Sequence, residues 1–360
     1  MTTKHKWSDA VFITKKEEIL EHYNGKKSSC LYILGRGFDP RMVVGLTLLH
    51  EVDLDCETLL IDFSSESEYT TQEQNELIAS NIEKLKKIDS NYKELKIPDD
   101  ATLPIYLKQH LIIPEKCNRV IVDISSMPQS VSFNIIKQLL KSIELKKQNH
   151  RAIKMDIVAC ENSSLDDAIS PTDLGLASFL VGFDTFSNDL EADVGRVPIW
   201  FPLLGRACGP ELDKLQSLLA PEEICPVLPF PSRNPRRSEE IFLEMGEALF
   251  SELEIDRRDI LYVAEQNVLD IYDKLHEAIQ HYNKVFKEIG EPKFYVSLGS
   301  SKLIGLGALL VHLELSELRS AAGILFAQVS NNGYKINMSE YDPLFNKVCL
   351  LCLEDDRYEW

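Results

Sequence analysis

The stretch Cys30–Met42, CLYILGRGFDPRM, joins a short apolar run directly to two glycines, two arginines and an aspartate. A continuous apolar run of this length is typical of a strand that is covered on both faces, as the strands of parallel sheets are. In open α/β sheets, ligands bind at the turns that follow such strands. The stretch therefore predicts a buried parallel strand that opens into a ligand-binding turn. A tight turn closed by a solvated salt bridge is the alternative.

Similar apolar runs alternate with amphipathic helical patterns along most of the chain, which indicates a mostly parallel sheet flanked by helices. We expect strands at residues 30–35, 58–63, 119–125, 154–160, 197–203, 223–230, 259–265, 294–299, 323–329 and 347–354. The fold class that this pattern predicts is α/β, with a Rossmann-like, mostly parallel sheet. No internal repeat is evident in the sequence.

Residues 161–196 interrupt the alternation because they are acidic and rich in serine and glycine around a single apolar island. We expect a Rossmann-like half at residues 1–160, an irregular acidic excursion or lid at 161–222, and a C-terminal α/β half at 223–360. A long surface loop with one packed turn accounts for residues 161–196 equally well.

The composition excludes several classes of function. The 57 acidic and 39 basic side chains give a net charge of −18, which argues against a direct nucleic-acid footprint and against adsorption to anionic membranes. The N-terminal residues lack the apolar core of a signal peptide, and the longest apolar stretches are too short to span a bilayer. The scattered cysteines are typical of reduced, buried thiols, so we expect a cytoplasmic protein. Cys349 and Cys352 lie in a strand-like run with no second pair, so no metal site is expected.

At the first strand end, Gly35 and Gly37 permit a sharp turn and a close backbone approach. Arg36 and Arg41 can fork onto a phosphate or a carboxylate, while Asp39 can orient an arginine, hold a hydroxyl group or coordinate Mg²⁺. The spacing is not G-x-G-x-x-G and the P-loop lysine is missing, so neither a standard dinucleotide site nor a Walker site is predicted.

A second junction follows the expected strand 119–125, where Ser125 and Ser126 precede Pro128. The two serines can donate hydroxyl groups to a ligand at the helix N-terminus, or they can simply cap the helix. Asp123 lies inside an apolar run, so its carboxylate needs a buried partner. We expect that partner to be an arginine, a lysine or the N–H groups of a helix.

Two further junctions have similar chemistry. Ser300, Ser301 and Lys302 end one strand and begin a helix of small residues, which is a pattern typical of an anion-binding nest. Arg233 and Arg236 belong to a dense positive cluster in an extended, proline-rich loop. The alternatives are a capped helix with a solvated lysine and a salt-bridged surface loop.

The stretch LGRACGPEL at residues 204–212 repeats the strand–Gly–Arg–Gly theme of the first junction more weakly. In one parallel sheet, right-handed crossovers bring all strand carboxyl ends to the same edge. We therefore expect a common cleft on one sheet edge that is lined by Arg36, Asp39, Ser125, Ser126 and Lys302.

Catalytic patterns are less evident. None of the eight histidines lies at these junctions, which weakens a Ser-His-Asp or Cys-His hydrolase interpretation. There is no G-x-S-x-G stretch and no paired-carboxylate pattern of a glycosidase.

The stretches DISSMP, VLPFPSRNPRR, EQNVLDIY and SLGSSKLIGLGALL resemble sequences of uncharacterised Rossmann-like proteins encoded in prokaryotic multigene loci, some of them antiviral defence islands. The resemblance implies a cytoplasmic prokaryotic protein that works alongside partner proteins.

Three hypotheses follow. The first is a Rossmann-like component of a prokaryotic, antiviral multi-protein system that recognises a nucleotide or a similar small anion. The second is a Mg²⁺-dependent enzyme acting on a nucleotide or phosphorylated metabolite, with Asp39 or Asp123 as the metal ligand or general base. The third is an assembly subunit with a vestigial pocket, in which residues 161–196 and 354–360 contact protein partners or a second copy of the chain.

Overall fold

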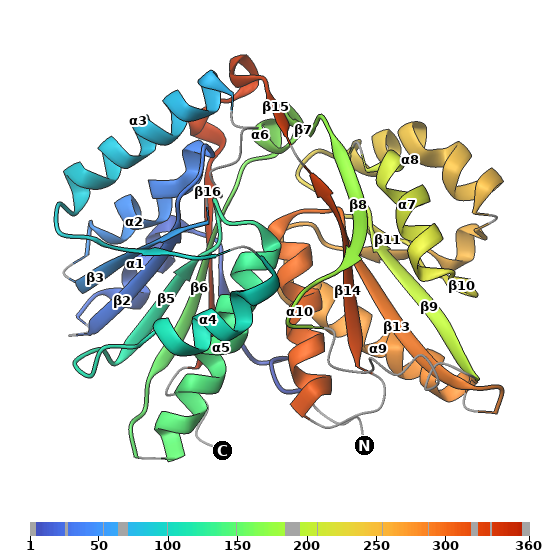
Figure 1. Cartoon of the computed structure of the whole chain (residues 1–360), viewed down its shortest axis with the longest axis horizontal. Coiled ribbons are helices and arrows are strands. Elements are labelled where there is room, and N and C mark those ends of the chain that lie inside the picture. The colour runs from blue at the N-terminus through green and yellow to red at the C-terminus, as the bar shows by residue number, and fades with distance from the viewer. Residues whose placement is uncertain are drawn as a thin grey trace. The chain divides into compact units, whose positions relative to one another are not determined.

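The computed structural model describes residues 5–25, 28–52, 54–63, 71–98, 100–148, 150–183, 195–206, 208–253, 255–286, 288–317, 323–331 and 333–354. The chain divides into two compact units (Figure 1). The first unit comprises Asp9–Asn162 and Asp342–Trp360, and the second comprises Met1–Ser8 and Ser163–Tyr341. No helix in the described ranges is both long and apolar enough to cross a membrane.

The first unit is built on a mixed sheet that is parallel except for two strands at one edge. Its strands lie in the order β1 (Val11–Ile13), β16 (Lys347–Glu354), β6 (Lys154–Glu161), β5 (Arg119–Asp123), β2 (Ser29–Gly35), β3 (Asp55–Asp62) and β4 (Lys93–Lys96). Counted along the chain from β2, the parallel strands lie in the order third, second, first, fourth, fifth. This is the strand order of a Rossmann fold.

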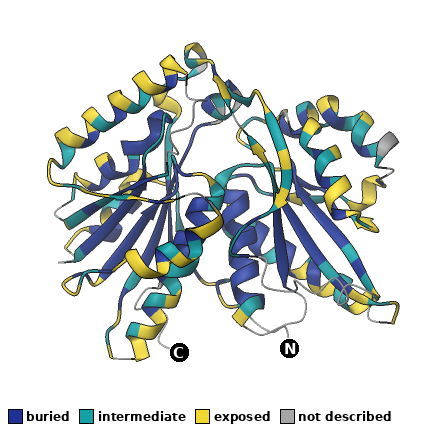
Figure 2. Cartoon of the chain, in the orientation of Figure 1, coloured by how far each residue is buried: buried dark blue, intermediate teal, exposed yellow. Residues whose placement is uncertain are grey.

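Helices flank this sheet, with their exposed sides turned to solvent and the strands buried between them (Figures 1 and 2). The helices are α1 (Lys16–Tyr23), α2 (Val44–Leu49), α3 (Gln72–Ile88), α4 (Leu103–His110) and α5 (Gln129–Gln148), with 3₁₀ turns at Pro40–Val43 and Asp100–Thr102. Thr71 and Gln74 form a reciprocal capping box at the start of α3.

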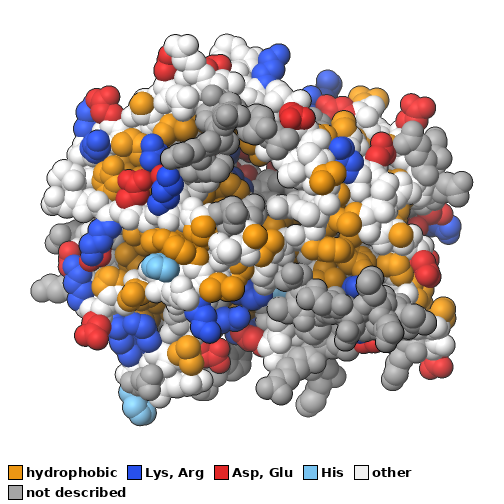
Figure 3. Space-filling model, viewed as in Figure 1, with side chains coloured by type: hydrophobic (Ala, Val, Ile, Leu, Met, Phe, Trp, Pro, Cys, Tyr) orange, Lys and Arg blue, Asp and Glu red, His pale blue; other side chains and the backbone are white. Residues whose placement is uncertain are grey.

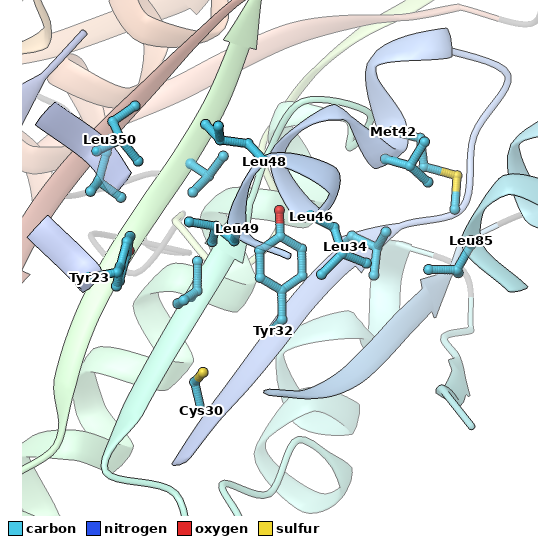
Figure 4. Packing of buried hydrophobic residues seen from close by; sticks show 14 of the residues in the cluster. Tyr23, Cys30, Tyr32, Leu34, Met42, Leu46, Leu48, Leu49, Leu85 and Leu350 are labelled. Carbon is cyan, nitrogen blue, oxygen red and sulfur yellow. The ribbon is translucent and has the colours of Figure 1, made fainter. Parts of the chain in front are cut away.

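The strand in the opening stretch, β2, is buried on both faces, as its continuous apolar run predicts. Tyr32 and Leu34 pack with Leu46, Leu49 and other apolar side chains of α1, α2 and α3 (Figure 4). Leu31 and Ile33 alternate with them and are also buried. Because both faces are covered, β2 is held in the middle of the sheet, and its carboxyl end lies at the centre of one sheet edge.

The second unit is built on a sheet with the order β12 (Leu261–Val263), β11 (Val227–Pro229), β9 (Arg196–Leu203), β13 (Glu291–Leu298), β14 (Ile324–Asn331) and β8 (Leu174–Phe179), with β10 (Glu223–Ile224) also paired to β9. Only β8 is antiparallel among the pairings of these described strands. Counted from β9, and with β10 set aside, the parallel strands again lie in the order third, second, first, fourth, fifth.

The helices of this unit are α6 (Ser163–Ala168), α7 (Gly209–Leu219), α8 (Arg237–Glu247), α9 (Val268–Phe286) and α10 (Lys302–Glu317). A π-helical turn follows α8 at Ala248–Glu252, and 3₁₀ turns occupy Arg257–Asp259 and Met338–Glu340. A separate ribbon pairs β7 (Ile169–Pro171) with β15 (Tyr334–Ile336), and a further 3₁₀ turn at Pro343–Phe345 precedes β16 in the first unit.

The two units therefore repeat one topology, although no repeat was expected from the sequence. The heptapeptide Leu-Gly-Arg-x-x-x-Pro occurs at residues 34–40 and again at 204–210, each time after the first parallel strand of a unit. The repeat escapes a reading of the sequence because strand order is conserved between the units while few side chains are.

The α/β fold class is confirmed, and each expected strand is present. The expectation of one sheet is wrong, because the strands separate into two sheets. The units also differ from the expected division. Residues 163–222 contribute β8, β9 and α7 to the second unit, so they are not an excursion from it, and β16 returns to the first unit. Residues 184–194 lie outside the described residues.

Candidate functional site

The centre of the candidate site is the point in the first unit where β2 and β5 lie side by side. Ile33 of β2 is paired with Val122 of β5, so the turns that follow the two strands are neighbours. The chain runs from β2 outward to β3 on one side and from β5 outward to β6 on the other. Open α/β sheets bind ligands at such a switch in strand order, outside the carboxyl ends of the strands.

The two turns touch each other, and glycine is what permits the contact. A Cβ atom on Gly35 would overlap the side chain of Met127 and lie 2.9 Å from the ring of Phe63. A Cβ atom on Gly37 would lie 3.1 Å from the carbonyl oxygen of Ser126. The hydroxyl group of Ser126 donates a hydrogen bond of 2.7 Å to the carbonyl oxygen of Gly35. The glycines thus allow a close backbone approach, and the backbone that approaches belongs to the β5 turn.

Asp39 and Arg41 pair with each other inside the first turn. The carboxylate of Asp39 accepts hydrogen bonds from Nε of Arg41 at 3.0 Å and Nη2 at 2.8 Å, and also from the backbone N–H of Arg41 at 2.9 Å. Both residues are buried. Asp39 is also the N-cap of the 3₁₀ turn that begins at Pro40. The pair therefore holds the turn in shape.

Asn81 of α3 fixes the same turn from the other side. Its side-chain amide donates hydrogen bonds to the carbonyl oxygens of Gly37, at 3.0 Å, and Asp39, at 2.9 Å. Asn81 is almost completely buried. The sequence analysis missed this residue, although a polar amide among the apolar positions of a helix is a detectable signal.

Arg36 points toward the ends of β3 and β4. Its Nη1 lies 3.0 Å from Oδ2 of Asp62 and 3.4 Å from Oε1 of Glu94, while its backbone N–H donates to the carbonyl oxygen of Ile61. The side chain of Arg36 is 35% exposed and that of Asp62 only 5%. The Nε of Arg36 is buried and makes no hydrogen bond within the described residues.

Asp62 is the functional candidate that the sequence analysis missed. It is the last residue of β3, the second parallel strand of the unit. In Rossmann folds this position carries the acidic residue that accepts hydrogen bonds from the ribose of a nucleotide. The signal in the sequence is an aspartate that ends the apolar run following the Gly35 turn.

Asp123 is buried, as expected, and a tyrosine is among its partners. Its Oδ2 accepts a 2.6 Å hydrogen bond from the hydroxyl group of Tyr32, and its Oδ1 accepts one from the backbone N–H of Ser125 at 2.9 Å. A Cβ atom on Gly45 of α2 would lie 2.6 Å from that same Oδ2, so the helix packs directly on this pair. Burial and then the neighbouring Asp123 carboxylate raise the pKa of Tyr32 well above its usual value, so Tyr32 remains a donor.

The two serines after β5 have different roles. Ser125 is completely buried, and its Oγ accepts a hydrogen bond from the backbone N–H of Cys160 at 2.8 Å, which links β5 to β6. Ser126 is half-buried and reaches the Gly35 turn, as described above. Of this pair, Ser126 is the one placed nearer to solvent at the start of α5.

The second unit has the equivalent switch point between β9 and β13, where Leu203 is paired with Leu298. A Cβ atom on Gly205 would overlap the carbonyl oxygen of Gly299, so these two turns also touch. Nη2 of Arg206 lies 2.9 Å from Oε1 of Glu244 on α8. The arginine after the first strand of each unit thus forms an ion pair with a carboxylate.

The remaining predicted site residues lie in this second unit. Ser300, Ser301 and Lys302 are half-buried at the start of α10, and Ser301 caps the helix by accepting the N–H of Ile304 at 3.4 Å. Arg233 and Arg236 are exposed in the loop after β11.

The loop that carries Arg233 and Arg236 is anchored by their neighbour Arg237. The buried pair between Arg237 and Glu265, at 2.7 Å, fixes the loop, and Oε2 of Glu265 also accepts the backbone N–H of Arg233 at 3.2 Å. This ion pair agrees with the salt-bridge alternative given for the loop.

The expectation that Lys302 shares one sheet edge with Arg36, Asp39, Ser125 and Ser126 is wrong. The rule that parallel strands end at one edge holds within a sheet, and these residues follow strands of two different sheets. The predicted site residues therefore form two groups, one on each unit.

The cysteines are free thiols, and their chemistry is that of core residues. Burial raises the pKa of Cys208, Cys225 and Cys349 to about 12 in each case. A thiol with a raised pKa is a poor nucleophile at neutral pH. On the face that Figure 3 shows, Lys and Arg side chains are interspersed with Asp and Glu in each unit.

No protein-family model matches the sequence, and no curated protein matches it. Three solved structures share low similarity. A universal stress protein from Pseudomonas aeruginosa UCBPP-PA14 aligns with a TM-score of 0.23 and 7% identity over 84% of this chain and 94% of that chain. A functionally unknown protein from Pseudomonas aeruginosa PAO1 has a TM-score of 0.22 and 9% identity, over 85% and 93% of the two chains. A UDP-N-acetylglucosamine 2-epimerase has a TM-score of 0.24 and 10% identity, over 83% and 92%. The fold assignment rests on the strand order of the two sheets.

Proposed function

We propose that the protein recognises a nucleotide or a similar small anion at the carboxyl ends of β2, β3 and β5 in the first unit. The observation that carries the proposal is the position of Asp62, which ends the second strand of a Rossmann-ordered sheet beside Arg36 and the Gly35 turn. A ribose offers hydroxyl donors to the carboxylate of Asp62, and a phosphate offers acceptors to the guanidinium of Arg36.

Arg36 has capacity for such a ligand while it keeps its ion pairs. Its contacts to Asp62 and Glu94 both use Nη1, and its buried Nε makes no hydrogen bond within the described residues. A guanidinium carries five N–H donors in a fixed fork. A phosphate that meets the other edge of the fork gains donors without removing the contact that orients Asp62.

The phosphate does not occupy the place that it takes in a standard dinucleotide site. That place is the N-terminus of the first helix, where the carboxylate of Asp39 already caps the 3₁₀ turn and accepts the N–H of Arg41. A second anion there would meet a negative charge at hydrogen-bonding distance. This arrangement agrees with the departure of the turn from the G-x-G-x-x-G pattern.

The same contacts weaken the enzyme hypothesis, because Asp39 and Asp123 accept hydrogen bonds from Arg41, Tyr32 and Ser125. Recognition without turnover is the function that we propose. The proposal extends to partner proteins of a cytoplasmic prokaryotic system, including antiviral defence systems, and this part rests on the sequence resemblance alone.

The test is calorimetric titration of the purified protein with adenosine, AMP, ADP and ATP and with inorganic phosphate, each with and without Mg²⁺. We expect Arg36→Ala to weaken nucleotides about 10–100-fold while it spares adenosine, and Asp62→Asn to weaken both, because hydrogen bonds to charged groups contribute about 1.5–3 kcal/mol. Arg258→Ala is the matched control, since Arg258 forms an exposed ion pair with Asp256 at 2.6 Å in the second unit. Mass spectrometry of ligand released from fresh protein identifies the natural compound.

Two results overturn the proposal. One is that the wild type binds none of these compounds and carries none on purification, which favours the assembly subunit. The other is that Lys302→Ala abolishes binding while Arg36→Ala leaves it unchanged, which moves the site to the second unit.

A further inference from the structure

A cluster in the second unit joins two imidazoles and a carboxylate, far from the switch point in sequence. His5 comes from the N-terminal segment, His276 from α9 and Glu314 from α10. One possible ligand atom from each residue lies within 4.8 Å of the other two. The rings of His5 and His276 lie 3.8 Å apart, and Nε2 of His276 lies 3.8 Å from Oε1 of Glu314.

The environment of His276 indicates a missing partner. The residue is 3% exposed, and neither of its ring nitrogens makes a hydrogen bond within the described residues. A buried polar group without a hydrogen bond is costly, and most such groups in proteins bind something. Burial and the adjacent His5 also lower the pKa of His276, so its ring is kept in the neutral form that a metal ion requires.

We propose that His5, His276 and Glu314 bind a zinc ion that fastens the N-terminal segment to α9 and α10. Two neutral imidazoles and one carboxylate form a common zinc ligand set, in which bonds are about 2.0–2.2 Å long and the fourth position is open to water or another ligand. A modest adjustment of the three side chains brings them within this distance. His5 is half-buried, so the fourth position faces the more open side of the cluster.

The contacts around Glu314 fit this role. Its Oε2 accepts a short hydrogen bond from the hydroxyl group of Tyr272, and its Oε1 accepts the backbone N–H of Lys6 at 3.1 Å. Tyr272 in turn accepts the backbone N–H of Trp7 at 3.1 Å. Such second contacts orient the ligands of metal sites and hold them in place. They also place the N-terminal segment against the helices, with His5 at the ion.

A second cluster shows why the first is preferred. His22, Asp156 and Cys352 also lie within reach of one ion, in the first unit. There, however, the guanidinium of Arg119 contacts Asp156, and the hydroxyl group of Tyr23 donates to the same oxygen. A cation would meet a buried positive charge at its carboxylate ligand. At His5, His276 and Glu314 no arginine or lysine side chain contacts the carboxylate among the described ion pairs.

The experiment measures zinc binding to the full chain by competition with a chromophoric chelator, together with the absorption spectrum of the Co²⁺-loaded protein. We expect one zinc ion at this site, with a Co²⁺ spectrum that lacks thiolate charge-transfer bands. His5→Ala and His276→Ala should lose more zinc affinity than the roughly 10–100-fold that follows loss of an outer partner. His281→Ala changes an exposed histidine on the same helix and should bind as the wild type does.

His276 is buried, so its variant can fail to fold; His5 lies in the N-terminal segment, and its variant keeps the test decisive. Zinc should also slow hydrogen exchange at the amides of Lys6 and Trp7 in the wild type and not in His5→Ala. The proposal is overturned if His5→Ala binds zinc as tightly as the wild type. It is also overturned if the Co²⁺ spectrum shows thiolate bands that Cys352→Ser removes, which assigns the metal to the other cluster.

Discussion

The guanidinium of Arg41 and the carboxylate of Asp39 neutralise each other two residues apart, with Nη2 and Oδ2 separated by 2.8 Å in a buried turn. The charges that were expected to meet a ligand instead meet each other. The turn is therefore rigid before any ligand arrives, and the ligand-facing charge after β2 is that of Arg36.

Breaking the Asp39–Arg41 pair should destabilise the first unit. Asp39→Ala leaves the buried guanidinium without its bidentate partner, and we expect a loss of about 3–5 kcal/mol in the free energy of unfolding. Urea denaturation measures the change. Asp256→Ala removes the partner of the exposed Arg258 and should cost less than about 1 kcal/mol. Equal losses in the two variants would show that the Asp39–Arg41 pair is not the determinant.

The hydrogen bond between Tyr32 and Asp123 should be worth more than a neutral one. Tyr32→Phe removes the donor and leaves a buried carboxylate, which we expect to cost about 1.5–3 kcal/mol. The double variant with Asp123→Asn should lose less than the sum of the two single losses, because the second change acts on a contact that is already gone. Simple additivity in urea denaturation would contradict a direct coupling.

The glycines at the two switch points should differ in their tolerance of a methyl group. In Gly205→Ala the new Cβ meets the backbone carbonyl of Gly299, while in Gly35→Ala it meets the flexible side chain of Met127. We expect both to be destabilised, by about 1–3 kcal/mol for Gly35→Ala and more for Gly205→Ala. Gly246→Ala in α8, where the nearest atom is 3.9 Å away, should be neutral or more stable by up to about 1 kcal/mol. Thermal unfolding ranks the three, and the reverse order would refute the close approach at Gly205.

The charge of Glu211 should make stability depend on pH. Burial at the start of α7 raises the pKa of Glu211 from 4.5 to about 7. Since the folded state holds the proton more tightly than the unfolded state does, this residue's contribution to stability is fully present below pH 4.5 and is lost as the pH rises to about 7.

Glu211→Gln should therefore gain stability relative to the wild type across that range, by about 2 kcal/mol at pH 8 compared with pH 4. Glu239→Gln, at an exposed position in α8, serves as the control. Urea denaturation at several pH values makes the comparison. A constant difference between Glu211→Gln and the wild type would remove Glu211 as the cause.

The sequence by itself determined the elements and the local turns. The apolar run of β2, the capping box at Thr71 and the glycines after each first strand depend on neighbours a few residues away, so they are legible in the chain. The pairing of Asp39 with Arg41 is also local, although its direction was not foreseen.

Only the tertiary structure decided which strands share a sheet and which distant side chains meet. An apolar strand is compatible with any apolar neighbour, so the sequence did not record that β9 and β13 leave the sheet of β2 and β5. Arg36 reaches Asp62, and His5 reaches His276 and Glu314, because the strand order and helix packing bring them together across many residues. Contacts of this range depend on the whole fold, and no spacing in the chain encodes them.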